Sequence, residues 1–492
     1  MRFLEQNTSI IWILLATLLS VLLSPSPLLL DEETHLWIAQ QAAWFAPYDW
    51  AMPFPPFHET GFVFAHPPLF LWWLKLTGDS VFTAVPWLLL WWWSAWKLAE
   101  QHQVSPKLVL GMMLASAGVL MPLSRSMMPD LMVSALGAAA LVLYGKAESR
   151  SSNVVAGCIL GLAMWTKYPA VMLIVIPILW EKKFGKLLPF VCGALGVFFC
   201  GEFWIFMEYG EWHLWTVLQE AQVVGRGELS SRVVGLPLRL GLALLPMALI
   251  GLSVRPMFPL VIGLIGLFVW GDSTAIYLTL GTGVMALLWK GNRWLVSWVL
   301  LVWLGVVVGH NYASPRYWLV TCIPLSVLAV QHCVDWKQWK QWTVIGVATL
   351  WMGTLMYTER IHANEIVRLT TQIETDLHNE YPNSIEEIAF SGEWTFRQQM
   401  LERGYLPFDH EGSHTQNMAQ KMVLTAVNSA GWTPHTDDGW TKVQMWEAQS
   451  VHVRLSVPED SVGWYADTLG FYPVQLLRLA KPIDRVELWK KQ

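Results

Sequence analysis

Residues 187–207 read LLPFVCGALGVFFCGEFWIFM, an apolar run that holds a single charged residue, Glu202. A membrane-spanning helix needs about 20 mainly apolar residues, because unpaired backbone groups are too costly in hydrocarbon. Three lysines (Lys182, Lys183 and Lys186) lie directly before the run. The stretch therefore predicts a spanning helix with a positively charged flank.

The whole chain has a similar character. Of its 492 residues, 54% are hydrophobic and 14% are charged, and the mean hydropathy is +0.39. Soluble globular chains usually carry about 25% charged residues. Thirteen apolar runs qualify as spanning helices: 9–30, 80–98, 107–122, 131–146, 153–166, 169–181, 187–207, 234–253, 257–271, 274–289, 294–309, 317–333 and 342–357. The composition therefore predicts a polytopic membrane protein.

The charges divide the chain into two domains, 1–357 and 358–492. The second part holds 19 of the 37 acidic and 12 of the 32 basic residues. It opens with a polar helical stretch over 358–380 and continues with short β-like runs at 388–390, 422–427, 451–457 and 474–479, and a helix near 395–403. The predicted fold is mainly α, with about thirteen transmembrane helices followed by a small C-terminal α/β domain.

The distribution of basic residues predicts the orientation. With the N-terminus in the cytoplasm, the turns that follow even-numbered spans are cytoplasmic, and most basic residues of the spanning region lie there, as the positive-inside rule requires. These residues are Lys97, Lys107, Lys146, Arg150, Lys182, Lys183, Lys186, Arg255, Lys290, Arg293, Lys337 and Lys340. An odd number of spans places the C-terminal domain outside the cytoplasm. We expect a multi-pass protein of the bacterial plasma membrane.

Two classes of protein are excluded. The net charge is −5 and there is no arginine-rich stripe, so a basic nucleic-acid surface is absent from the sequence. The five cysteines lie in or beside apolar runs, and the polar C-terminal region has none, which argues against a disulfide scaffold.

The first outer loop carries candidate catalytic acids. Asp31 and Glu32 follow the first apolar run directly, and Asp31 shares a helix face with His35, four residues on. The loop closes with His66, which stands before two prolines. An acidic cap on a helix N-terminus is the structural alternative for these carboxylates. We favour a functional role for Asp31.

Other charged groups recur on the same face. Asp130 stands at the start of the fourth predicted span, where an N-cap role is an equal alternative. Lys167 lies in a short outer turn, and Arg316 precedes Tyr317 at the start of the twelfth span. Arg226 and Arg232 lie in a longer outer loop. Snorkelling to the headgroups is the structural alternative for the cations. Together they suit a lipid-bound anionic substrate, with its phosphate at headgroup depth.

Five short motifs, in order, resemble the GT-C glycosyltransferase superfamily, and most closely its protein O-mannosyltransferases and lipid A aminoarabinose transferases. The likeness covers roughly residues 1–335. The motifs are Asp31-Glu32, the HPPL sequence at 66–69, residues 125–130, the GLAMWTKYP sequence at 161–169, and Pro315-Arg316-Tyr317.

The resemblance implies a polyprenyl-phosphate-linked sugar as the donor and a hydroxyl outside the cytoplasm, on a glycan, lipid or protein, as the acceptor. It implies that Asp31 is the general base, with Glu32 and Asp130 as further candidates. Many bacterial members have lysine where this chain has His66, which leaves the partner of Asp31 open. His66, Lys167, Arg226, Arg232, Arg316 and Tyr317 are the candidate substrate-binding residues.

The reaction type agrees with these residues. An attacking hydroxyl must lose its proton, and a positioned carboxylate typically contributes about 10²–10⁴-fold to the rate. The leaving phosphate gains charge, which arginine or lysine would stabilise; a divalent metal ion stays an alternative, and no cofactor is assigned. Direct displacement predicts inversion at the anomeric carbon. Two other functions remain open: a transporter or flippase for a lipid-linked solute, and a non-catalytic membrane scaffold.

Overall fold

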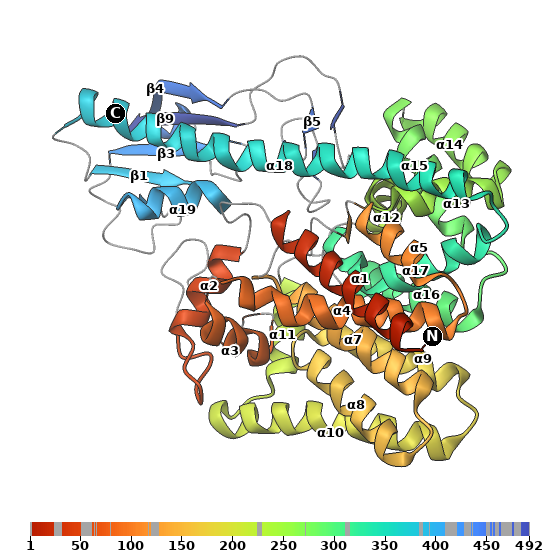
Figure 1. Cartoon of the computed structure of the whole chain (residues 1–492). Helices are drawn as coiled ribbons and strands as arrows, with labels where there is room; N and C mark the ends of the chain where they lie inside the picture. Colours follow the sequence, from red (N-terminus) through yellow and green to blue (C-terminus); the bar gives the residue numbers. More distant parts are fainter. Residues whose placement is uncertain are drawn as a thin grey trace.

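A computed structural model describes most of the chain (Figure 1). The described residues are 2–23, 32–50, 62, 64, 66–78, 80–116, 118–119, 127–223, 229–270, 272–309, 315–382, 387–392, 394–408, 421–427, 434, 436–448, 453–454, 456–457, 462–463, 475–476 and 484–491. They form a helical body and a mixed sheet, which the long helix α18 (Gln338–Glu380) joins.

The helical body accounts for most of the chain. Its helices in chain order are α1 (Arg2–Leu22), α2 (Glu32–Gln41), α3 (Pro68–Thr77), α4 (Val81–Gln101), α5 (Pro106–Leu114), α7 (Pro129–Lys146), α8 (Arg150–Met164), the 3₁₀ helix η2 (Tyr168–Val171), α9 (Met172–Trp180), α10 (Phe184–Tyr209), α11 (His213–Val223), α12 (Leu229–Ala243), α13 (Leu245–Val254), α14 (Met257–Trp270), α15 (Asp272–Ala286), α16 (Arg293–Gly309), the 3₁₀ helix η3 (Pro315–Trp318) and α17 (Leu319–His332).

Each of the thirteen predicted spans overlaps at least one of these helices or, for 342–357, the helix α18. Among the described residues, however, only α10 is both long and apolar enough to cross a membrane by itself. It has 26 residues and contains the 187–207 run. Several other apolar helices have 10 to 17 residues. The mainly helical fold is confirmed, and the count of thirteen spans stays a prediction.

One predicted span is sharply bent. The run 234–253 breaks into α12 and α13, and its two halves, Gly235–Ala243 and Leu245–Val254, meet at 105°. Leu244 leaves the helical conformation at the break, with φ −117° and ψ 45°. Pro246 follows in the first turn of α13, where its missing N–H is tolerated at a helix start but not within a helix. The expectation of one continuous helix is therefore wrong here.

Close packing of α8 on α10 fixes the part of the body that carries the site. A Cβ atom on Gly157 would collide with the carbonyl of Phe190, and one on Gly193 would collide with the carbonyl of Val154. Small residues let helix backbones approach closely, which is a common way of packing helices in membranes. The C-terminal end of α8, and the turn after it, are held in place by this contact.

The C-terminal sheet has the strand order β2-β1-β3-β9-β4. Its strands are β1 (Ile388–Ser391), β2 (Leu406–Pro407), β3 (Met422–Ala426), β4 (Trp440–Glu447) and β9 (Arg485–Lys491). β1 runs parallel to β2 and β3, whereas β9 is antiparallel to β3 and β4. The predicted strands at 388–390 and 422–427 are confirmed, and the helix predicted near 395–403 is α19 (Trp394–Glu402). β4 and β9 were not predicted.

The C-terminal half of α18 packs against this sheet. Ile366, Leu369, Ile373 and Leu377 are buried at three- and four-residue intervals, so they form one apolar face, which lies in a core with Phe390 of β1. The predicted domain boundary at 357/358 falls inside α18, which continues through it as a single helix. Short strand pairs lie farther along the chain: β5 (Val453–Arg454) with β8 (Gln475–Leu476), and β6 (Ser456–Val457) with β7 (Val462–Gly463).

Candidate functional site

Asp130 lies in the first turn of α7, and its side chain is almost fully buried. The N-cap position belongs to Met128, whose backbone is extended at φ −107° and ψ 140°, and Pro129 is the first helical residue. The N-cap interpretation of Asp130 is therefore wrong. A carboxylate in the first turn still interacts favourably with the positive end of the helix dipole.

Lys167 reaches this carboxylate from the turn between α8 and η2. Its backbone is extended (φ −156°, ψ 121°), which directs the chain away from the helix that precedes it. Its Nζ donates a hydrogen bond of 2.8 Å to Oδ1 of Asp130. Only 9% of the lysine side chain and 7% of the aspartate side chain are exposed. The ammonium thus lies inside the fold.

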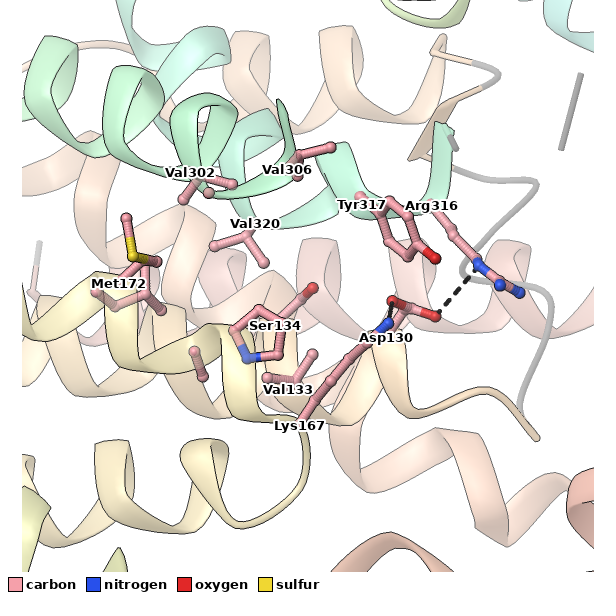
Figure 2. A pocket seen from close by; sticks show the side chains of 14 residues that line it. Asp130, Val133, Ser134, Lys167, Met172, Val302, Val306, Arg316, Tyr317 and Val320 are labelled. Atoms are coloured by element: carbon pink, nitrogen blue, oxygen red, sulfur yellow. Dashed lines mark hydrogen bonds and ion pairs between the residues drawn. The ribbon is translucent and has the colours of Figure 1, made fainter. Parts of the chain in front are cut away.

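Arg316 approaches the other carboxylate oxygen from η3 (Figure 2). Its Nε lies 3.7 Å from Oδ2 of Asp130, and its guanidinium also contacts Sδ of Met128 at 3.5 Å. The ring of Tyr317 lies beside both cations, with its centroid 4.6 Å from Nζ of Lys167 and 5.5 Å from Cζ of Arg316. Residues from α7, the α8–η2 turn and η3 therefore converge on one point.

Two cations, Lys167 and Arg316, face the carboxylate of Asp130 in this cluster. Burial by itself raises the pKa of Asp130, but the nearby charges of Lys167 and Arg316 more than offset this effect and bring the pKa below its ordinary value. Asp130 is therefore ionised at neutral pH and is a weak base. Two cationic side chains at one end of a cavity are favourable for binding an anion, because charged donors make strong hydrogen bonds to anionic oxygens.

A cavity of about 60 Å³ opens beside the cluster. Its polar end is formed by Asp130, Ser134, Lys167, Arg316 and Tyr317. Figure 2 shows that the rest of its wall is apolar. This apolar part consists of Val133, Pro169, Ala170, Met172, Leu173, Val302, Gly305, Val306 and Val320. The cavity thus offers charged groups at one end and hydrocarbon surface at the other.

Two histidines lie near the cluster. The ring of His66 is 5.6 Å from the ring of His35, whose Nδ1 contacts the carbonyl oxygen of Met127 at 3.0 Å. Burial lowers the pKa of His66 well below its ordinary value, and the charge of Lys167 lowers it further. His66 is therefore neutral at pH 7. Its buried Nδ1 has no hydrogen-bond partner among the residues that the structure describes.

The other sequence candidates are placed only in part. Glu32 is buried at the start of α2, two residues from the last residue of the first predicted span. Asp31 and Arg226 lie outside the described residues, and Arg232 is placed in α12 without a description of its side chain. The structure thus brings together His66, Asp130, Lys167, Arg316 and Tyr317, and it leaves the positions of Asp31, Arg226 and Arg232 relative to them as predictions.

A second polar network joins Tyr168, Glu202 and His213, and the sequence did not predict it. The hydroxyl of Tyr168 is 2.6 Å from Oε1 of Glu202, and Oε2 of Glu202 accepts a hydrogen bond of 3.0 Å from the N–H of Leu214. Tyr168 also contacts Nδ1 of His213, whose Nε2 is 3.0 Å from the carbonyl oxygen of Phe64. The signal was present: Glu202 is the charged residue inside the 187–207 run, and such groups need a partner in the membrane.

This network holds the segment that carries Tyr48 and His66 on the helical body. Tyr48 stacks on the ring of His213 at a centroid distance of 4.4 Å, and its hydroxyl donates to the carbonyl oxygen of His66 at 3.0 Å. The carbonyl of Phe64 can only accept, so Nε2 of His213 carries the proton and Nδ1 accepts. The loop segment that carries His66 is thereby fixed beside the cation cluster.

His213 makes the stability of the protein sensitive to acid. Burial lowers its pKa to about 3, whereas the unfolded value is about 6.5. The unfolded chain thus binds more protons between these values, so stability should fall as the pH falls from about 6.5 toward 3. We expect His213→Gln to show a smaller decrease in Tm between pH 7.5 and 5.5 than the wild type. Equal decreases in both proteins would contradict a buried neutral His213.

Within the described residues, no group of three or more His, Cys, Asp or Glu side chains is arranged to hold a metal ion. The cluster at the cavity has a single carboxylate, which is already paired with cations. Within the part of the chain that the structure describes, the polar end of the cavity thus carries two cationic side chains and one carboxylate.

Comparisons with known proteins give structural similarity only. No protein-family model and no curated protein matches the sequence. The chain is similar to the crystal structure of ArnT from Cupriavidus metallidurans bound to undecaprenyl phosphate, at 14% identity and a TM-score of 0.46, covering 69% of this chain and 62% of ArnT. It is also similar to the apo state of ArnT, at 12% identity and a TM-score of 0.41, covering 86% of this chain and 93% of ArnT.

A third similar structure is arabinofuranosyltransferase AftD from Mycobacteria, determined by cryo-EM. The identity is 12% and the TM-score is 0.40, with 97% of this chain and 41% of AftD covered. The chain thus spans less than two thirds of AftD and of the lipid-bound ArnT structure. Both proteins are GT-C glycosyltransferases, the superfamily that the sequence motifs resemble. All three TM-scores are below 0.5.

Proposed function

We propose that this chain is an integral-membrane glycosyltransferase of the GT-C type. It transfers a sugar from a polyprenyl-phosphate donor to a hydroxyl of a glycan, lipid or protein on the extracytoplasmic side. One observation carries the proposal: Lys167 and Arg316, which are far apart in the sequence, form the charged end of a cavity whose remaining wall is apolar. A lipid phosphate combines the same two properties.

The cation cluster supports binding of the donor phosphate. Asp130 contacts both cations and keeps them in a fixed position. Both cations line the cavity, so a phosphate there would interact with both of them. Arg316 can donate parallel hydrogen bonds to phosphate oxygens, whereas Lys167 supplies a compact charge. We therefore assign these two residues to phosphate binding and Asp130 to positioning them.

The apolar wall supports binding of the first isoprenoid units. Val133 of α7, Leu173 of α9 and Val306 of α16 contribute to it, so three helices enclose this part of the cavity. An isoprenoid chain passing from lipid onto such a wall gives up no hydrogen bonds with water. Affinity for the donor should therefore depend mainly on the charged end, and the apolar part should determine which lipid tails can enter.

In the proposed reaction, the acceptor oxygen attacks the anomeric carbon as the bond from that carbon to the phosphate oxygen breaks. The acceptor proton goes to a carboxylate, and the electron pair of the broken bond leaves with the polyprenyl phosphate. Lys167 and Arg316 would stabilise the charge that develops on the leaving oxygen. Asp130 is a poor base because of its low pKa. Asp31 therefore remains the proposed base, with Glu32 as the next candidate.

Transfer of a radiolabelled polyprenyl-phosphate sugar by the purified protein in proteoliposomes tests this function. Appearance of label on an envelope acceptor supports the transferase. Movement of label across the vesicle membrane without transfer would indicate a flippase. If label is neither transferred nor moved, the non-catalytic scaffold is the remaining alternative. Inversion at the anomeric carbon of the product supports direct displacement, and retention would contradict it.

Arg316→Lys should not be a silent change. Lysine keeps the charge but loses the planar, two-pronged donor geometry of arginine. If the guanidinium binds the phosphate more tightly as it leaves, kcat should fall together with kcat/KM, by about tenfold for each 1.4 kcal/mol lost. If it binds the phosphate equally well in the ground state and the transition state, KM alone should rise. Steady-state kinetics with varied donor separates these results, and unchanged kinetics would remove Arg316 from the site.

A further inference from the structure

A second cleft lies at the opposite end of α7 from the cation cluster. It has a volume of about 950 Å³ and is lined by residues of the α7–α8 turn and of the start of α10. The lining residues are Gly145, Lys146, Ala147, Glu148, Arg150, Asn153, Lys183, Gly185 and Lys186. From Asp130 to Lys146, sixteen residues on, a helix rises about 24 Å. This distance approaches the thickness of the hydrocarbon core, so the cleft belongs at the other membrane face.

The charge of the cleft is strongly positive. Four cations line it, and Glu148 is its one acidic lining residue. Lys186 is held over the ring of Tyr144 at 4.6 Å and lies 3.8 Å from a carboxylate oxygen of Glu181. Lys183 is exposed. Basic pockets between helices at the cytoplasmic face are a known way of binding anionic lipid headgroups.

Asn153 adds a hydrogen-bond acceptor that lacks a donor. Its side chain is 2% exposed, and its amide N–H group donates to the carbonyl of Ser149 at 2.8 Å. This bond fixes the orientation of the amide, because a flipped amide would place two oxygens together. The other end, Oδ1, is buried without a hydrogen-bond partner among the described residues. A ligand that donates a hydroxyl hydrogen bond would satisfy it.

Apolar side chains continue the surface next to the cations. Phe184 and Leu188 of α10 are 69% and 44% exposed, and Val154 and Val155 of α8 are 39% and 56% exposed. Phe184 directly follows Lys183, and Val154 directly follows Asn153. Charged groups and hydrocarbon surface therefore meet at this edge, as they do at the boundary between headgroups and acyl chains.

We propose that this cleft binds an anionic phospholipid whose headgroup carries a hydroxyl, such as a phosphoglycerol headgroup. Its phosphodiester lies among Lys146, Arg150, Lys183 and Lys186, a headgroup hydroxyl donates to Oδ1 of Asn153, and its acyl chains lie along α8 and α10. The site is separate from the proposed donor pocket and does not depend on the transferase activity.

Titration of the purified full-length protein with dihexanoyl phosphatidylglycerol tests the site, with binding measured by calorimetry. The wild type should bind this lipid at least tenfold more tightly than dihexanoyl phosphatidylcholine. Each of Arg150→Gln and Lys183→Gln should raise Kd about fivefold, the usual contribution of one basic residue near a charged lipid surface. Lys183→Gln changes an exposed side chain, so it should leave the fold intact.

The controls separate this site from general attraction to basic residues. Lys337→Gln with Lys340→Gln removes two cations from another predicted cytoplasmic turn and should leave Kd unchanged. Asn153→Ala should weaken phosphatidylglycerol but not phosphatidylmethanol, which has the same charge and no headgroup hydroxyl. Three results would overturn the proposal. One is a rise in Kd for phosphatidylglycerol in the Lys337 and Lys340 control as large as in Arg150→Gln or Lys183→Gln. The others are equal affinity of the wild type for phosphatidylcholine, and full displacement of phosphatidylglycerol by an equal concentration of inorganic phosphate.

Discussion

Asp31→Asn is expected to lower sugar transfer by about 10²–10⁴-fold while leaving folding, membrane insertion and donor binding unchanged. An amide keeps the size of the carboxylate but cannot take the proton of the acceptor hydroxyl. The prediction follows from the sequence position of Asp31, directly after the first apolar run, together with the low pKa of Asp130, which makes that residue a poor alternative base. Single-turnover transfer of labelled sugar measures the effect.

Glu33→Gln is the matched control, since it removes a neighbouring carboxylate of the same loop by the same chemical change. We expect it to alter transfer much less than Asp31→Asn. Near-wild-type turnover in Asp31→Asn would contradict the assignment, and Glu32→Gln would then identify the next candidate. A large loss of donor binding in Asp31→Asn would also contradict a role confined to proton transfer.

Asp130→Asn should have the largest effect on stability. It removes the carboxylate that pairs with the buried Lys167 and the mostly buried Arg316, and breaking a buried ion pair from one side typically costs about 3–5 kcal/mol. Thermal unfolding in detergent measures the loss. Polyprenyl phosphate should restore much of it, because its phosphate supplies the missing negative charge. A ligand at one hundred times its Kd stabilises by about 2.7 kcal/mol.

Glu100→Gln provides the comparison for Asp130→Asn. Glu100 pairs with Lys97 at 2.8 Å on α4, where both side chains are substantially exposed, and such pairs contribute about 0–1 kcal/mol. The stability of Glu100→Gln should differ little from that of the wild type. Polyprenyl phosphate should raise the Tm of both proteins by the same amount. If Asp130→Asn is as stable as Glu100→Gln, the cluster does not act as the buried charged unit that the structure indicates.

The sequence predicted the helical character of the body well, because apolar runs and lysine-rich turns are local signals. It could not predict the break at Leu244, since neither leucine nor the proline that follows it distinguishes a kink from a helix start without the neighbouring helices. β9 was missed for a different reason. Arg485–Lys491 is short and charged at both ends, and its four buried central residues gain their environment only from pairing with β3 and β4.

The members of the site were predictable as candidates, but their arrangement was not. Asp130, Lys167 and Arg316 stand at the outer ends of predicted spans, which local patterns reveal. Their convergence depends on the packing of α7, α8 and η3, and so does the role of Asp130 as an ion-pair partner. Lys75 shows the opposite outcome. It is also a cation of the predicted outer face, but its Nζ donates to the carbonyls of Gln40 and Ala42 at the end of α2, which is a structural role.

The proposed function requires that the cavity beside Lys167 and Arg316 holds a lipid phosphate. A binding titration of polyprenyl phosphate tests this directly in the wild type, Lys167→Ala and Arg316→Ala. The uncharged polyprenol is the comparison ligand. We expect tight binding of polyprenyl phosphate to the wild type and weak binding of polyprenol. The Kd for the phosphate should rise about tenfold or more in each variant, as expected for the loss of a charge-assisted contact of about 1.5–3 kcal/mol. Equal affinity for polyprenol and polyprenyl phosphate, or an unchanged Kd in both correctly folded variants, would contradict it.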